Sequence, residues 1–219
     1  MTELTVKKIR DSKAARWSVV ALVSFTMLCG YIITDVMAPL KTMLEQELNW
    51  TSSEYGLFTS GYGWLNVFVF MLIISGIILD KMGVRFTGIS ATLVMLIGTS
   101  IKYWAISTTF ENNIITIGNW FSINKQVLLA GTGYAIFGVG VEAIGITATK
   151  AIVKWFKGKE VALALGLNVA TARPHRDIAR HVGITTYRRP LSKSELPVIV
   201  LYSHAYNRIT FFSCILHNG

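Results

Sequence analysis

Apolar residues in this sequence gather into blocks of twenty or more, and each block is long enough to cross a bilayer. A helix needs about 20 apolar residues to span the hydrocarbon core. Four segments meet this length, at 17–40, 55–79, 86–106 and 127–153. A fifth apolar run, 161–173, is too short to cross unaided and reads as a partial span. The sequence therefore predicts an all-α, polytopic membrane helix bundle.

Composition supports this prediction and excludes several other classes. The chain is 52% hydrophobic and only 15% charged, whereas soluble domains carry about a quarter charged residues. The net charge of +9 resides in connectors and in the last stretch of the chain, so we expect no nucleic-acid partner. Cys29 and Cys214 make no metal or disulfide spacing. We expect a lipid bilayer as partner, no metal, no cofactor, no catalytic cluster and no cleavable signal peptide.

The connectors between the apolar blocks alternate in their content of basic residues. The N-terminal segment 1–16 and the connectors 80–85 and 154–160 are rich in lysine and arginine, whereas 41–54 and 107–126 are poor in them. Cytoplasmic loops of membrane proteins carry the excess of basic residues. We therefore expect a cytoplasmic N-terminus and a non-cytoplasmic loop at 107–126. This pattern fits a lysosomal membrane and a plasma membrane equally.

The connector between the second and third apolar blocks is short and charged. Gly83 permits a tight turn of the backbone at the membrane surface. Asp80, at the end of one helix, can pair with Arg85 across that turn. An ordinary short cytoplasmic loop is the alternative interpretation. The full pattern consists of Gly76, Asp80, Lys81, Gly83 and Arg85.

This spacing resembles the signature loop of the major facilitator superfamily, and it departs from that loop at Val84. The resemblance implies a loop that helps latch the two halves of a transporter. The stretches 154–160, 165–168 and 172–173 are similar to the lysosomal dipeptide-transporter branch and its microbial relatives. The resemblance implies a partial N-terminal half of the major-facilitator fold, a small solute such as a dipeptide, and an accessory membrane protein as a further partner.

Glu142 lies well inside the fourth apolar block, where an ionisable side chain is costly and usually faces the bundle interior. We expect it to bind a cationic group or a proton, and a structural carboxylate neutralised by a neighbour is the alternative. Glycines at seven-residue intervals surround it and predict close approach of neighbouring helices. They form two stripes, Gly131, Gly138 and Gly145, and Gly133 and Gly140.

Three other charged residues lie within or near the apolar blocks. Arg173 is the natural partner of Glu142, because an acid and a base facing one cavity could hold both ends of a zwitterion. The resemblance implies the same substrate-binding pair. Asp35 precedes Pro39 by four residues, which predicts a kink that shapes a pathway mouth; an interfacial helix cap is the alternative. Lys102 is interpreted as a snorkelling lysine.

The character of the sequence changes after Arg173. Residues 174–219 hold all four histidines and several arginines, so this tail cannot cross a membrane. We expect an irregular, non-family tail that arose from an out-of-register frame or an alternative exon, and a genuine tail is the alternative. The chain is thus interpreted as a truncated transporter, inactive alone, whose parent works by alternating access. A small four-span membrane adaptor is the alternative function.

Overall fold

A computed structural model describes residues 12–108, 110, 114–117, 121–158 and 160–172. The described part is almost entirely helical, as expected from the sequence, apart from one antiparallel hairpin that pairs Ile114 with Asn124 and Ile117 with Phe121. This hairpin lies within the loop predicted at 107–126. The elements in chain order are α2 (Lys13–Asp35), α3 (Lys41–Leu48), α4 (Ser52–Phe68), α5 (Met71–Ser107), β1 (Ile114–Ile117), β2 (Phe121–Asn124), α6 (Lys125–Trp155) and α7 (Val161–Ala172).

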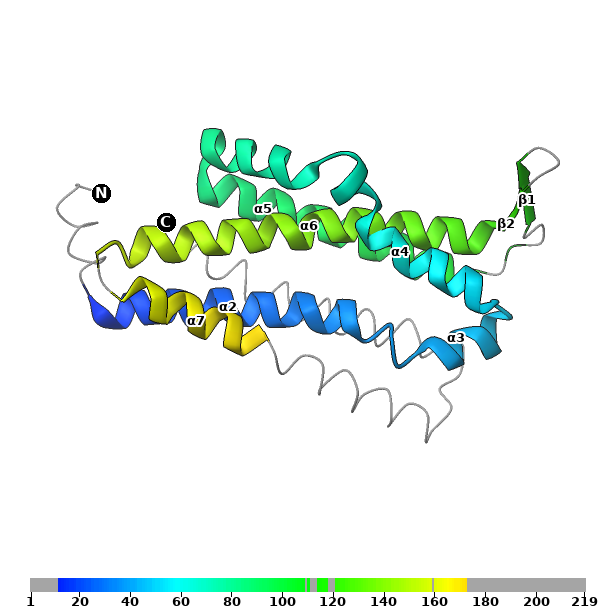
Figure 1. The fold of residues 1–219 in the computed structure, drawn as a ribbon, viewed down its shortest axis with the longest axis horizontal. Helices are drawn as coiled ribbons and strands as arrows, with labels where there is room; N and C mark the ends of the chain where they lie inside the picture. Colours follow the sequence, from blue (N-terminus) through cyan, green and yellow to red (C-terminus); the bar gives the residue numbers. More distant parts are fainter. Residues whose placement is uncertain (1–11, 109, 111–113, 118–120, 159, 173–219) are drawn as a thin grey trace.

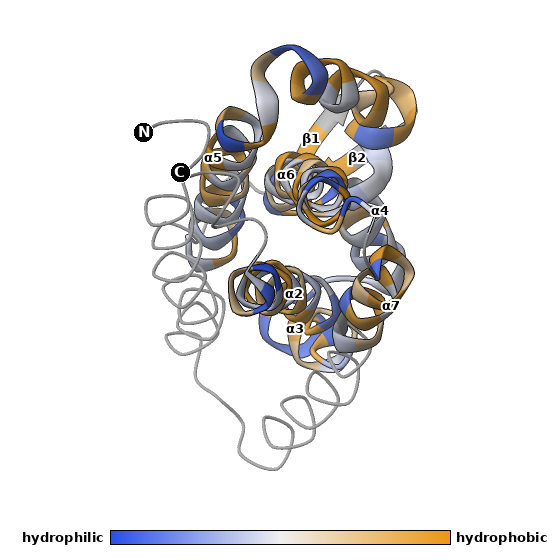
Figure 2. Ribbon diagram, turned by 90° about the vertical axis from the view of Figure 1, so that its left-hand side faces the viewer, coloured by the Kyte–Doolittle hydropathy of each residue, from blue (hydrophilic) through white to orange (hydrophobic). Residues whose placement is uncertain are grey.

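Helix α6 is the centre of the bundle. It packs most extensively against α5 and α4, and it also contacts α2 and α7 (Figure 1). Helices α2 and α7 lie side by side and run in the same direction, as the views in Figures 1 and 2 show. Most of α6 is buried, whereas α5 exposes many large apolar side chains. Such an exposed apolar surface suits contact with lipid chains.

The close approach of neighbouring helices predicted for the glycine stripes of α6 is confirmed at Gly138 and Gly133, which face different helices, whereas Gly145 meets only a side chain of α2 at 3.6 Å. A Cβ atom added at Gly138 would lie 2.5 Å from the carbonyl oxygen of Tyr62 in α4. A Cβ atom added at Gly133 would lie 2.6 Å from the backbone nitrogen of Lys102 in α5. Only glycine allows backbones to approach this closely. The stripes therefore determine how α4 and α5 pack on α6.

Within the described residues, three helices are long and apolar enough to cross a membrane, judged by length and composition: α2, α5 and α6. The structure differs from the expected span at 55–79, because α4 ends at Phe68 and the backbone of Phe70 adopts φ 52° before α5 begins. The residues from Val67 to Phe70 are all exposed, so packing against the other described helices does little to support a continuous helix there. Helix α5 in turn runs through the expected loop at 80–85, with a break at Gly83.

The segment expected as one span at 17–40 also ends earlier, because α2 stops at Asp35. Pro39 has no backbone N–H, so the Asp35 carbonyl accepts a hydrogen bond from Ala38 at 3.2 Å instead. The structure thus has a helix end followed by a turn, rather than a kink within one helix. The short helix α3 follows, within the segment expected as a connector.

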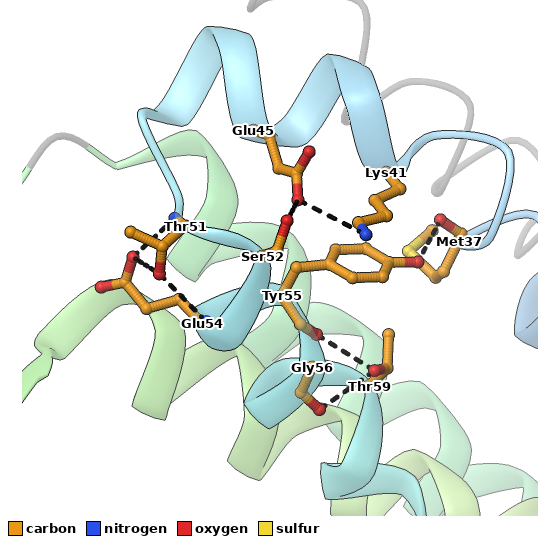
Figure 3. Close-up of polar contacts among 9 residues, drawn as sticks. All are labelled: Met37, Lys41, Glu45, Thr51, Ser52, Glu54, Tyr55, Gly56 and Thr59. Carbon is orange, nitrogen blue, oxygen red and sulfur yellow. Dashed lines mark hydrogen bonds and ion pairs between the residues drawn. The ribbon is translucent and has the colours of Figure 1, made fainter.

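Polar contacts fix the corner where α3 meets α4 (Figure 3). Thr51 and Glu54 form a capping box at the start of α4, which satisfies two otherwise free backbone N–H groups. The Ser52 hydroxyl donates to Glu45 of α3 at 2.7 Å, and the Tyr55 hydroxyl donates to the carbonyl of Met37 at 2.8 Å. These bonds tie the turn after α2, the helix α3 and the start of α4 into one unit.

Candidate functional site

The central candidate is a polar cluster at the contact between α4 and α6. Glu142 of α6 is partly buried, and the Tyr62 hydroxyl of α4 donates a hydrogen bond to its Oε1 at 2.8 Å. The close approach at Gly138 brings the two helices near enough for this bond. A carboxylate oxygen can accept further hydrogen bonds. Glu142 therefore retains acceptor capacity for a ligand.

Asn66 adds a second acceptor, one helical turn after Tyr62. Its Nδ2 donates to the Tyr62 carbonyl at 3.3 Å and lies 3.3 Å from the place of a Cβ atom added at Gly138. Its Oδ1 is buried and has no hydrogen-bond partner among the described residues. Since a buried polar atom without a partner is costly, this oxygen is suited to receive a donor. The cluster of Tyr62, Asn66 and Glu142 is here called the acceptor cluster.

The structure does not bring Asp35 into the acceptor cluster. Asp35 is the last residue of α2, and its neighbour Thr34 accepts a hydrogen bond through its carbonyl from the Tyr134 hydroxyl at 3.0 Å. Tyr134 precedes Glu142 by eight residues on α6, which is about 12 Å along a helix axis. Asp35 is therefore separated from Glu142 along the axis of the bundle. Arg173 and the tail 174–219 lie outside the described residues.

The interpretation of Lys102 as a snorkelling lysine is wrong. Its side chain does not snorkel to the surface, because it is fully buried, with 0% exposure, between α5 and α6. Its Nζ lies 4.8 Å from the ring centroid of Tyr134 and 5.2 Å from that of Phe137. Gly133 lets α5 approach α6 closely at Lys102, and this approach encloses the lysine between the two helices.

The loop pattern from Gly76 to Arg85 is partly as expected. Gly83 adopts φ 81°, which a residue with a side chain rarely adopts, so it makes the turn as predicted. The predicted partner of Asp80 is wrong. Asp80 forms an ion pair with Lys150 of α6, and Lys150 also donates to the Leu79 carbonyl at 3.3 Å, whereas Arg85 is exposed. Gly76 has open space around it, and Lys81 is exposed.

This pairing yields a prediction for three variants. We expect Lys150→Met and Asp80→Asn to lower the free energy of unfolding by similar amounts of up to about 1 kcal/mol, because both side chains are largely exposed to screening. The double charge exchange, Asp80→Lys with Lys150→Asp, should recover part of this loss. Reversible unfolding in mixed detergent micelles measures the effect. Arg85→Gln is the matched control, and a larger loss there than at Lys150 would contradict the pairing.

Sequence reasoning missed Tyr62 and Lys150 as partners of charged residues, and it missed Asn66 beside Tyr62. Asn66 carried a usable signal, since a strongly polar side chain inside an apolar block usually faces other helices. Tyr62 is four residues before Asn66, so both occupy one face of a helix. Lys150 gave no comparable signal, because lysines near helix ends are ordinary at the membrane surface.

Comparison with known proteins agrees with this architecture. The family model of the Major Facilitator Superfamily matches residues 20–173. The lysosomal dipeptide transporter MFSD1 of Danio rerio is 28% identical over 145 residues, which cover 66% of this chain and 28% of that protein. The human MFSD1 is 26% identical over 161 residues, covering 73% of this chain and 31% of that protein.

A bacterial transporter is similar to the same degree. The hexuronate transporter of Escherichia coli strain K12 is 28% identical over 160 residues, covering 72% of this chain and 32% of that protein. The chain thus spans less than a third of the length of each of these relatives. The family match ends at residue 173, where the resemblance seen in the sequence also ends. This match, together with the apolar helical bundle, shows that the chain belongs to the major facilitator superfamily.

Proposed function

We propose that these helices belong to a transporter that moves small zwitterions, such as dipeptides, across a membrane by alternating access. The observation that carries the proposal is the acceptor cluster. Glu142 offers a carboxylate held by Tyr62, and Asn66 offers a buried oxygen without a partner among the described residues. A protonated amino group has three donors and a positive charge. Such a group can donate to a carboxylate and to an amide oxygen, which are the two kinds of acceptor in this cluster.

The same chemistry favours an amine-bearing solute over an anionic sugar. Of the relatives described above, the two MFSD1 proteins are named for dipeptides and the bacterial protein for hexuronates. A hexuronate carries a carboxylate and no amine, so it would repel Glu142. In our proposal Arg173 binds the carboxyl end of the zwitterion, because guanidinium and carboxylate make charge-assisted bonds. Asp35 then shapes the pathway mouth, which is separated from the amine site along the axis of the bundle.

Alternating access requires two halves that rock about a central site. We propose that the described helices supply part of the first half, that they do not transport by themselves, and that the N-terminus is cytoplasmic. The loop with Asp80 and Gly83 would then help latch the two halves in one state, and an accessory membrane protein would be a further partner. The adaptor alternative is not favoured, because the chain belongs to a family of transporters.

Uptake into proteoliposomes tests the proposed substrate class. The transporter that carries these helices should accumulate radiolabelled lysyl-alanine, and unlabelled dipeptides should compete for uptake. Galacturonate at the same concentration should not compete, because it lacks an amine for the acceptor cluster. Competition by galacturonate equal to that by dipeptides would contradict the assignment of the site to an amino group.

A further inference from the structure

Lys102 is a buried lysine that forms no ion pair within the part of the chain that the structure describes. Its side chain has 0% exposure, and Nζ has no hydrogen-bond partner among the described residues. Two aromatic rings of α6 face it, those of Tyr134 and Phe137, at 4.8 Å and 5.2 Å from Nζ to the ring centroids. Cation–π attraction offsets part of the cost of burying the ammonium group.

An apolar side chain would fit this place at a lower cost in stability. Replacing a buried charge with a well-packed hydrophobic residue is often neutral or stabilising. Sites where a protein departs from the most stable choice are frequently functional. A functional group that depends on the position of the two rings would explain why a lysine occupies this place.

Tyr134 connects Lys102 to two other parts of the bundle. Its hydroxyl donates to the Thr34 carbonyl of α2 at 3.0 Å. Its ring lies 5.6 Å from the Tyr62 ring, measured between centroids, and it stacks on Phe58 at 5.2 Å with an interplanar angle of 17°. Tyr62 in turn donates to Glu142. Contacts therefore run without interruption from the Lys102 ammonium to the Glu142 carboxylate.

We propose that Lys102 is a positioning residue for the acceptor cluster. The ammonium group holds the face of the Tyr134 ring, the ring supports Tyr62, and the supported Tyr62 hydroxyl orients Glu142 for the amino group of the substrate. The same contact holds the end of α2 through the bond from Tyr134 to Thr34. This inference rests on the proposed function of Glu142, and it assigns Lys102 no direct contact with substrate.

Uptake of lysyl-alanine by variants at position 102 tests the role of the charge. Lys102→Met keeps the length of the side chain and removes the cation, so KM should rise about fivefold or more, with little change in kcat. Lys102→Arg keeps the cation and should recover most of the affinity. Lys154→Met, at an exposed lysine on the same bundle, is the matched control and should leave KM unchanged. An unchanged KM in Lys102→Met, or equal losses in the Met and Arg variants, would overturn the proposal.

If Lys102→Met does not fold, Tyr134→Leu gives the second test, because it removes the ring and leaves the lysine. It should raise KM at least as much, because it also removes the bond to Thr34, and an unchanged KM there overturns the proposal. A readout without substrate separates this inference from the proposed function. Cys29 on α2 is buried, so its maleimide labelling in a Cys214→Ser background reports loosening of α2. Lys102→Met should raise this labelling several-fold even if Glu142 has no role in uptake, and unchanged labelling counts against the proposal.

Discussion

Replacing Glu142 by glutamine should reduce the affinity for a dipeptide about tenfold to a hundredfold. A hydrogen bond to a charged group contributes about 1.5–3 kcal/mol, and 1.4 kcal/mol corresponds to a factor of ten in affinity. The glutamine has nearly the same shape and can still accept from Tyr62, so the helices should stay packed. Initial rates of lysyl-alanine uptake over a range of concentrations measure the change.

Two further variants show whether the effect belongs to this carboxylate. Tyr62→Phe removes only the hydroxyl that holds Glu142, so it should raise KM by a smaller factor, about two- to tenfold. Glu47→Gln changes a carboxylate on α3, outside the acceptor cluster, and should change nothing. Uptake that is indifferent to Glu142→Gln would remove the assigned role of this residue and leave Glu142 as a structural carboxylate.

Gly98→Ala should destabilise the bundle by about 1–3 kcal/mol through overpacking. An alanine Cβ at this position would lie 2.7 Å from the Gly133 carbonyl oxygen and 2.8 Å from the Phe137 Cα, both in the backbone of α6. Backbone atoms cannot rotate away as side chains do, so α5 and α6 must separate. The loss should exceed the gain of about 1 kcal/mol that alanine gives over glycine in helix propensity. The midpoint of reversible unfolding in detergent micelles measures the net change.

Gly63→Ala is the matched control for this prediction. Gly63 also lies within a helix, but a Cβ atom there meets nothing within 4 Å. The substitution should therefore be neutral or stabilising by up to about 1 kcal/mol. Destabilisation of equal size at both positions would mean that the close contact between α5 and α6 is not what makes Gly98 sensitive.

The sequence predicted the helical class, the family and the glycine stripes because each depends on local patterns. Runs of apolar residues and the spacing of Gly133 and Gly140 are properties of one segment and need no partner to be recognised. Glu142 could be singled out for the same reason, since an acid in an apolar block is costly wherever the block packs. The roles of Asp35 and Arg173 remain predictions, and the structure describes only the first of these two residues.

The pairing of side chains was decided by the tertiary structure alone. From the sequence, Asp80 was expected to pair with Arg85 across the turn, yet it pairs with Lys150, seventy positions later in the chain. Lys102 looked like a lysine that reaches the surface, yet the approach of α5 to α6 at Gly133 encloses it against two rings. Hydropathy and spacing set which segments are helical, because these depend on each segment and its solvent. The direction in which a charged side chain points depends on which helix packs beside it, and that is a property of the whole bundle.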